Sequence, residues 1–366
     1  MSHVRSWFLA SICLALGCSD AAPAPVPSAS PGASSPVAAT GVASAPPPPA
    51  NAAQAVPSAS AVKPADVPRT VAFVGDISIS MVIGAYLDGS LAPAAPLEAG
   101  YPFGKVADRL KAYDLLVGNL ECVVTNRGQP TIKKPLKAPL DSGKRLLEAG
   151  FDVVSVANNH VQDMGDAGYA DMMTRLDKDG LPYAGGNLVD KSRSAMVVKD
   201  VRGVRVAVIG HYDIHADSAL RDVKQAREKA DVVIAFLHWG VEYSRDPTRL
   251  QRQWAHALID GGADVVVGGH AHIVHRDEIY KGKVISYSLG NFAFSGMVKE
   301  GARTGSVLEL ELSKAGVVSH GYRTIAIDDR GAPAWVGERT NEPVLDPPGE
   351  RALTALGKPI DFRALH

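Results

Sequence analysis

The stretch Asp264-Val265-Val266-Val267-Gly268-Gly269-His270-Ala271-His272 is an apolar, β-branched run that ends directly in two histidines. Strands buried on both faces read as continuous Val, Ile and Leu runs, and ligands gather at the carboxyl ends of such strands. Four further runs end in polar residues in the same way, at Val74-Gly75-Asp76, Gly118-Asn119-Leu120-Glu121, Ala157-Asn158-Asn159-His160 and His238-Trp239-Gly240. We therefore expect one shared site built from Asp, Glu, Asn and His, a ligand set for hard to borderline metals.

Length and charge allow one large domain or two ordinary ones. The chain has 366 residues and a formal net charge of -1, and it shows no basic tail or arm, so we expect no nucleic-acid partner. Of its three cysteines, Cys13, Cys18 and Cys122, only the last lies in the expected globular part. An intrachain disulfide is therefore not expected to hold the domain together.

The N-terminus has the form of an export signal. A weakly basic start is followed by an apolar run over residues 7–16, which is too short to span a bilayer. The run ends Leu14-Ala15-Leu16-Gly17-Cys18, which resembles a bacterial lipobox and implies a lipoprotein signal peptide over 1–17 with lipidation of Cys18. We expect an exported protein, lipid-anchored at the cell membrane or outer membrane; the alternative is an ordinary signal peptide with an incidental cysteine.

Residues 18–68 consist mainly of Ala, Pro, Ser and Val with almost no charge. Such a stretch cannot bury enough surface to offset its ordering entropy, so we expect a disordered tether rather than a folded N-terminal module. A flexible coil of this length reaches roughly 40 Å. We expect the folded domain over 69–341 and assign no structure to the tail, 342–366.

Within 69–341, strand and helix patterns alternate, which predicts an α/β domain. Strands are expected at 70–75, 114–118, 152–156, 182–184, 231–237 and 264–267, and helices at 104–112, 141–149, 166–179, 219–229 and 247–260. Residues 195–209 indicate a hairpin that turns at Arg202-Gly203, and two later hairpins turn at 281–283 and 314–316. The last part of the domain is therefore expected to be mainly β.

The polar endings have distinct expected roles. His270 and His272 face the same side if their segment is extended, because side chains alternate along a strand. Asp76 and Glu121 follow buried runs, where a carboxylate needs a cation or an ion pair. Asn159 offers a neutral oxygen and His238 completes the ligand set. His160, outside the ligand shell, is placed to donate a proton.

Further residues bear on the substrate. Lys133, Lys134 and Lys137, with Arg127 nearby, either meet an anionic polymer or phosphate or form a solvated loop. Glu242 and Asn291 lie at expected strand ends and are candidate substrate contacts. For Asn291 the alternative is that its hydrogen bonds hold a site loop.

At these residues the chain resembles the CapA family, named for poly-γ-glutamate capsule synthesis, within the metallophosphatase-like superfamily. The resemblance implies a four-layer α/β/β/α sandwich with the site at one edge of the sheets. The matching segments are Gly75-Asp76, Gly118–Glu121, Ala157–His160 with Asp163 and Gly165, His238–Tyr243, Gly262–Asp264, Gly269–His272 and Tyr287–Phe292.

By the superfamily pattern, Asp76 and His272 would hold a first metal, Asn159, His238 and His270 a second, and Glu121 would bridge them. His160 would protonate the leaving group. The superfamily's Asp-x-His is here Asp76-Ile77-Ser78, and its bridging Asp is replaced by Glu121, which weakens the first metal's ligand set. We expect one or two divalent ions, Mn, Fe or Zn. His275, near the histidine pair, is an extra ligand or a surface residue.

Two functions follow from the resemblance. One is a metal-dependent hydrolase, phosphoesterase-like, that acts on a phosphoester or an anionic envelope polymer during capsule synthesis or export. The other is a lipid-anchored accessory protein that binds such a polymer without catalysis, beside other capsule-synthesis proteins. A nutrient-scavenging phosphatase is disfavoured by Ser78 in place of the histidine.

Overall fold

The computed structural model describes residues 68–212, 216–343 and 345. The expected signal peptide, Cys18 and all of the expected tether but residue 68 lie outside the described residues, as does nearly all of the tail. Folded structure begins at Arg69, close to the expected start of the domain. Among the residues described, no helix combines the length and the apolar character that crossing a membrane requires.

The first sheet has the order β16-β15-β14-β1-β2-β5-β6, with β13 pairing the end of β1. Its parallel half consists of β1 (Arg69–Ile77), β2 (Leu115–Leu120), β5 (Val153–Ser155) and β6 (Tyr183–Ala184). Its antiparallel half consists of β14 (Thr304–Ser313), β15 (Gly316–Ile327) and β16 (Pro333–Thr340), while the short β13 spans Asn291–Ala293.

The second sheet has the order β11-β12-β10-β9-β8-β7. Its four central strands are parallel: β8 (Val204–Tyr212), β9 (Val232–His238), β10 (Val265–Gly269) and β12 (Lys283–Ser286). The edge strands β7 (Met196–Val201) and β11 (Glu278–Tyr280) pair antiparallel with their neighbours. A separate parallel pair is formed by β3 (Val123–Val124) and β4 (Lys137–Ala138).

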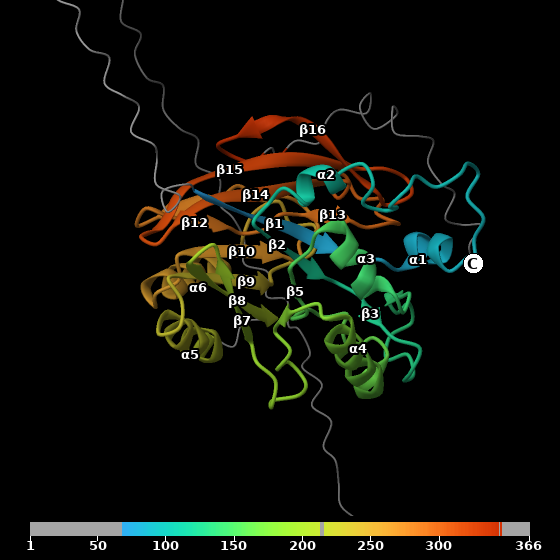
Figure 1. The fold of residues 1–366 in the computed structure, drawn as a ribbon, viewed down its shortest axis with the longest axis horizontal. Helices are drawn as coiled ribbons and strands as arrows, with labels where there is room; N and C mark the ends of the chain where they lie inside the picture. The colour runs from blue at the N-terminus through green and yellow to red at the C-terminus, as the bar shows by residue number, and fades with distance from the viewer. Residues whose placement is uncertain (1–67, 213–215, 344, 346–366) are drawn as a thin grey trace, which may run out of the picture. The chain divides into compact units, whose positions relative to one another are not determined.

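Helices cover the outer face of each sheet (Figure 1). On the first sheet lie α1 (Met81–Leu87), α2 (Ala107–Leu110), α3 (Ser142–Ala149) and α4 (Gly165–Asp179). On the second lie α5 (Ala216–Arg227) and α6 (Arg249–Asp260). The expected four-layer α/β/β/α sandwich is confirmed.

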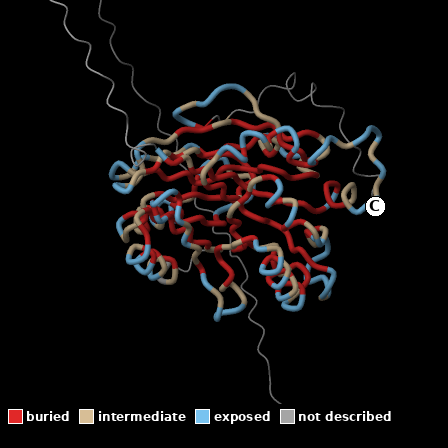
Figure 2. The backbone as a smooth tube through the Cα atoms, in the orientation of Figure 1, coloured by how far each residue is buried: buried red, intermediate tan, exposed pale blue. Residues whose placement is uncertain are grey.

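Strand periodicity produces these layers. In β1, Val71 and Phe73 pack into the cluster between the two sheets, whereas Ala72 and Val74 pack beneath the helices. In β9, Ile234 and Phe236 face the first sheet and Ala235 faces α5 and α6. Both faces are apolar, which is why the strands read as continuous runs. Figure 2 shows the resulting buried core along the strands.

Most expected elements are present, with shifts of a few residues at their ends. The helix expected from Pro247 begins at Arg249, because Thr248 caps it through the Gln251 backbone N–H in a reciprocal capping box. The structure adds elements that were not expected, namely α1, β3, β4, β13 and β16. Several are short, and short elements give too few residues for a periodic signal.

The contact between the sheets provides a test of this architecture. The rings of Phe73 and Phe236 meet edge to face across the layers, with centroids 6.1 Å apart. We expect Phe236→Ala to lower the free energy of unfolding by about 3–5 kcal/mol, because it leaves a cavity between the sheets. Urea unfolding measures this, with Val318→Ala, at an exposed position of β15, as the control, expected within about 0.5 kcal/mol of the wild type. Equal losses in both variants would contradict the assigned core.

Candidate metal centre

Polar side chains from both sheets meet at the carboxyl ends of the parallel strands. Asp76 lies near the end of β1 and Glu121 directly follows β2. His238 is the last residue of β9, and His270 and His272 follow β10. Because β1 contacts β10 across the sandwich, ligands from the two sheets can share one site.

Glu121 lies at the centre of this group. Its Oε1 is 3.4 Å from His238 Nε2, 3.8 Å from His272 Nε2 and 3.8 Å from His160 Nε2. Two groups of potential metal ligands, Glu121-His238-His270 and Asp76-Glu121-His272, each have their ligand atoms within 4.8 Å of one another. The Glu121 carboxylate therefore belongs to both groups.

The electrostatic state of the site favours a cation. Glu121 is fully buried, and neither of its oxygens has a hydrogen-bond partner among the described residues. Burial and, to a smaller extent, the charge of Asp76 raise the pKa of Glu121 well above its usual range. Burial also lowers the pKa of His238 and His270 to about 4, which leaves both imidazoles neutral and able to act as ligands.

A chain of amides orients His238. Asn158 Nδ2 donates to the carbonyl of Leu120 at 2.9 Å and to Asn119 Oδ1 at 3.1 Å, which fixes both amide orientations. Asn119 Nδ2 then faces Asp76 Oδ1 at 2.8 Å and His238 Nδ1 at 3.0 Å. His238 Nε2 is left to donate to Asn159 Oδ1 at 2.8 Å, and this proton has to leave if a metal binds at that nitrogen.

Asp76 and Asn291 hold the loop that carries His270 and His272. Asp76 Oδ2 accepts the backbone N–H of His270 at 2.9 Å. Asn291 is fully buried; its Oδ1 lies 2.9 Å from His272 Nδ1 and its Nδ2 donates to the carbonyl of Ala302 at 2.8 Å. This leaves His272 Nε2 directed at Glu121. Asn291 thus fits the loop-holding alternative, and its burial argues against direct contact with a substrate.

The extended conformation expected at the histidine pair is wrong. His270 and His272 have φ of 80° and 57°, so both residues lie in the left-handed region, and they reach the site from a turn rather than by strand alternation. Tyr243, with φ of 61°, donates its backbone N–H to Ala271 between them. Gly269 is needed at the turn because an added Cβ would lie 2.4 Å from Asp76 Oδ1. Three strained non-glycine residues therefore gather at one site.

His160 lies beside the ligand groups and is partly exposed. Its Nδ1 is 2.8 Å from Asp163 Oδ2 and its Nε2 faces Glu121. Burial alone would lower the pKa of His160, but the hydrogen bond with Asp163 and the charge of Glu121 outweigh it and raise the pKa. The ring is thus held at one nitrogen and open at the other.

The remaining expected residues lie at the rim or outside the centre. Lys133 and Lys134 are exposed in a loop tied to Asp163, which accepts Thr131 N at its carbonyl and Leu136 N at its carboxylate. Glu242 is exposed, and its charge acts on Glu121 and the nearby histidines. His275 is buried, and its Nε2 lies 2.8 Å from the carbonyl oxygen of Ser244. It is therefore neither a ligand of this centre nor a surface residue.

Sequence reasoning gave no role to Asn119, Asn158 or Asp163, although all three lie in the motifs quoted above. Each of them contacts another site residue and is not itself a candidate metal ligand. Their positions beside Glu121, Asn159 and His160 were the available signal. Asn119 and His238 are 119 positions apart, so their contact leaves no local pattern.

The donor set fits a divalent metal. It offers a buried carboxylate that has no hydrogen-bond partner in the described part of the chain, two neutral imidazoles and a second carboxylate, the chemistry preferred by Mn, Fe and Zn sites. Adjacent ligands of such ions lie about 3–3.6 Å apart. The separation of 3.1 Å between His270 Nδ1 and His238 Nε2 lies in this range, as does that of 3.4 Å between His238 Nε2 and Glu121.

The sequence is similar to those of bacterial capsule proteins. Residues 70–296 match the family described as bacterial capsule synthesis protein PGA_cap. The chain is 33% identical over 220 residues to the capsule biosynthesis protein CapA of Bacillus anthracis, covering 53% of this chain and 54% of that protein. It is 30% identical over 253 residues to the PGA biosynthesis protein CapA of Bacillus subtilis (strain 168), covering 63% and 67%. The chain thus spans about half to two thirds of these relatives.

Solved structures are similar only at low scores. A hypothetical protein from Thermus thermophilus has a TM-score of 0.46 at 18% identity, over 70% of this chain and 98% of that chain. The calcineurin-like phosphoesterase YfkN from Bacillus subtilis has a TM-score of 0.42 at 16% identity, over 76% and 91%. Neither likeness carries an argument about function. The family match, in contrast, spans well over half of the chain, and the protein therefore belongs to the bacterial capsule synthesis PGA_cap family.

Proposed function

We propose that the chain is a metal-dependent hydrolase of the cell envelope that acts during synthesis or export of an anionic, poly-γ-glutamate-type capsule polymer. The observation that carries the proposal is the Glu121 carboxylate, which is buried without a hydrogen-bond partner among residues 68–212, 216–343 and 345 and is shared by two groups of potential ligands. A cation offsets the free energy of burying such a group. Family membership supports the link to capsule synthesis.

In this proposal one ion would be held by Asp76, Glu121 and His272, and a second would be held by Glu121, Asn159, His238 and His270. Mn, Fe or Zn suits this set of oxygen and nitrogen ligands. When bound, such an ion polarises the scissile bond and lowers the pKa of water. The chain's own residues orient the ligands: Asn119 holds His238 at Nδ1, and Asn291 holds His272.

His160 is the proposed proton donor to the leaving group. Asp163 holds Nδ1 at 2.8 Å, so that the proton to be transferred is on Nε2, which points toward Glu121. A histidine whose pKa is raised is protonated to a larger extent near neutral pH, which suits a general acid.

Charges around the centre suit an anionic substrate only when a cation is present. Asp76, Glu121 and Glu242 bring negative charge, which a divalent ion reverses locally. Lys133, Lys134 and Glu242 would then be the contacts with the phosphoester or the anionic polymer. A lipid anchor at Cys18 would place the domain at the cell membrane or outer membrane, close to other capsule-synthesis proteins.

One observation favours a second function, polymer binding without catalysis. Ser78 stands where the superfamily pattern has a histidine, and its buried hydroxyl is bonded to Ser80 Oγ at 2.6 Å. It therefore offers no strong ligand, and the first ion has three candidate ligands, Asp76, Glu121 and His272. An accessory protein with a single structural ion would have the same geometry.

Glu121→Gln tests the proposed bridging role, because it removes the charge and keeps the shape. The raised pKa of Glu121 means that the metal-free wild type loses stability as pH rises above the usual glutamate range. We expect the metal-free variant to be more stable than the metal-free wild type at pH 8, by about 1–3 kcal/mol. Added Mn should raise the melting temperature of the wild type and leave the variant unchanged. Equal stabilisation of both proteins by Mn would contradict the role of Glu121.

Metal analysis and turnover test the function itself. We expect the protein purified without added metal to carry near-stoichiometric Mn, Fe or Zn, which Asp76→Ala/His270→Ala loses. The wild type should hydrolyse p-nitrophenyl phosphoesters or poly-γ-glutamate. His160→Asn is the matched variant, expected to keep its metal and lose about 10²–10⁴-fold in turnover.

The outcomes separate the two functions. Absence of metal from the wild type, even after Mn or Zn is added back, would rule out the hydrolase. Bound metal without turnover of any of these substrates would support the accessory function instead.

A further inference from the structure

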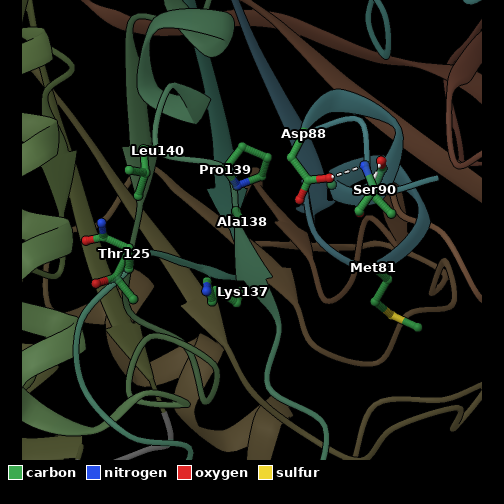
Figure 3. A pocket seen from close by; sticks show the side chains of 11 residues that line it. Met81, Asp88, Ser90, Thr125, Lys137, Ala138, Pro139 and Leu140 are labelled. Carbon is green, nitrogen blue, oxygen red and sulfur yellow. Dashed lines mark hydrogen bonds between the residues drawn. The ribbon is translucent and has the colours of Figure 1, made fainter. Parts of the chain in front are cut away.

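A groove lies between α1 and the segment that begins with β4 (Figure 3). Its volume is about 410 Å³. In Figure 3, Met81, Asp88 and Ser90 line one side, Thr125 and Leu140 the other, and Lys137, Ala138 and Pro139 lie between them.

The groove and the metal centre are built from the same chain segments. Five residues lead from Asp76 to Met81, and four lead from Glu121 to Thr125. At a maximum of about 3.6 Å per residue, these groove residues lie within roughly 14–18 Å of the ligands. The pairing of Val123 with Lys137 joins the walls, and Leu136 N is bonded to Asp163 Oδ2, which also holds His160. This upper limit corresponds to the length of a few units of an extended polymer.

The loop that forms one wall is strongly basic. Residues 126–140 contain Arg127, Lys133, Lys134 and Lys137 and no acidic residue. Lys137 is exposed and makes no salt bridge within the described part of the chain. Asp88, the acidic residue of the lining, accepts the backbone N–H of Ser90 at 2.9 Å. Of these cations Lys137 lines the groove, and its charge, which also acts on Asp88, is the one offered to an anionic ligand there.

Apolar side chains stand exposed beside these charges. Met81, Ile132 and Leu140 are 45%, 43% and 39% exposed. Met81 also has a left-handed φ of 50°, a strained state for a non-glycine residue, at the start of α1. A surface that combines ammonium groups with exposed methylene and thioether groups matches a polymer whose carboxylates are separated by methylenes.

We propose that this groove is a distal subsite that binds a carboxylate-bearing polymer segment beyond the unit at the metal centre. Its effect is to make the protein select long anionic chains over single units. The inference rests on the proposed function, because it takes the metal centre as the place where the polymer is handled.

The test is the binding of fluorescein-labelled poly-γ-glutamate to the full protein, measured by anisotropy at low salt. Lys137→Glu reverses the charge in the groove. Lys229→Glu, at an exposed position after α5, makes the same change of net charge on the other sheet's helical face and is the matched control. Ala85→Trp fills the groove without changing charge. We expect both groove variants to bind the polymer at least tenfold more weakly, the control to stay within twofold, and free glutamate to compete poorly.

Two results would overturn the subsite. One is unchanged polymer affinity in both groove variants, and the other is an equal loss in Lys229→Glu. Failure of the wild type to bind the polymer would overturn it as well. Metal content, measured on the same samples, reports separately on the proposed function: loss of polymer binding in the groove variants from a wild type that holds no metal would support the subsite and contradict the hydrolase.

Discussion

Burying a carboxylate without a hydrogen-bond partner costs several kcal/mol, and Glu121, where the two sheets meet, has no such partner among the residues that the structure describes. The charges of His272 and His160 offset this cost only in part, because burial still raises the pKa of Glu121 well above its usual range. His238 and His270 are neutral because burial lowers their pKa, and Asp76 adds a second negative charge. The buried Glu121 carboxylate is unfavourable without a cation and favourable with one. The surrounding residues are consistent with a bound cation.

The sandwich supplies the rigidity that such a site needs. Asp76 and Glu121 follow strands of one sheet, and His238 and His270 follow strands of the other. The core between the sheets fixes the distance between the two ligand pairs. The amides of Asn119 and Asn158 then set the rotation of His238, and Asn291 sets that of His272. Packing therefore decides where the ligands lie, and the hydrogen bonds decide which atoms they present.

The sequence was sufficient for the fold class and for which strand ends carry polar residues, because both are local. Continuous apolar runs identify buried strands, and their last residues identify the edge. It was not sufficient for the conformation of His270 and His272, since left-handed backbone in non-glycine residues is set by contacts such as the bond from Tyr243 N to Ala271. The burial of Asn291 and the contact of Asn119 with His238 arise from segments far apart in the chain.

The most direct measurement is anomalous diffraction at the Mn edge from crystals of the protein grown with Mn. The account predicts a peak bonded to the Glu121 carboxylate together with His238 and His270, and allows a second, weaker peak beside Asp76 and His272. Crystals that contain Mn but show no peak in contact with Glu121 would contradict the central claim, because the buried carboxylate would then have another explanation.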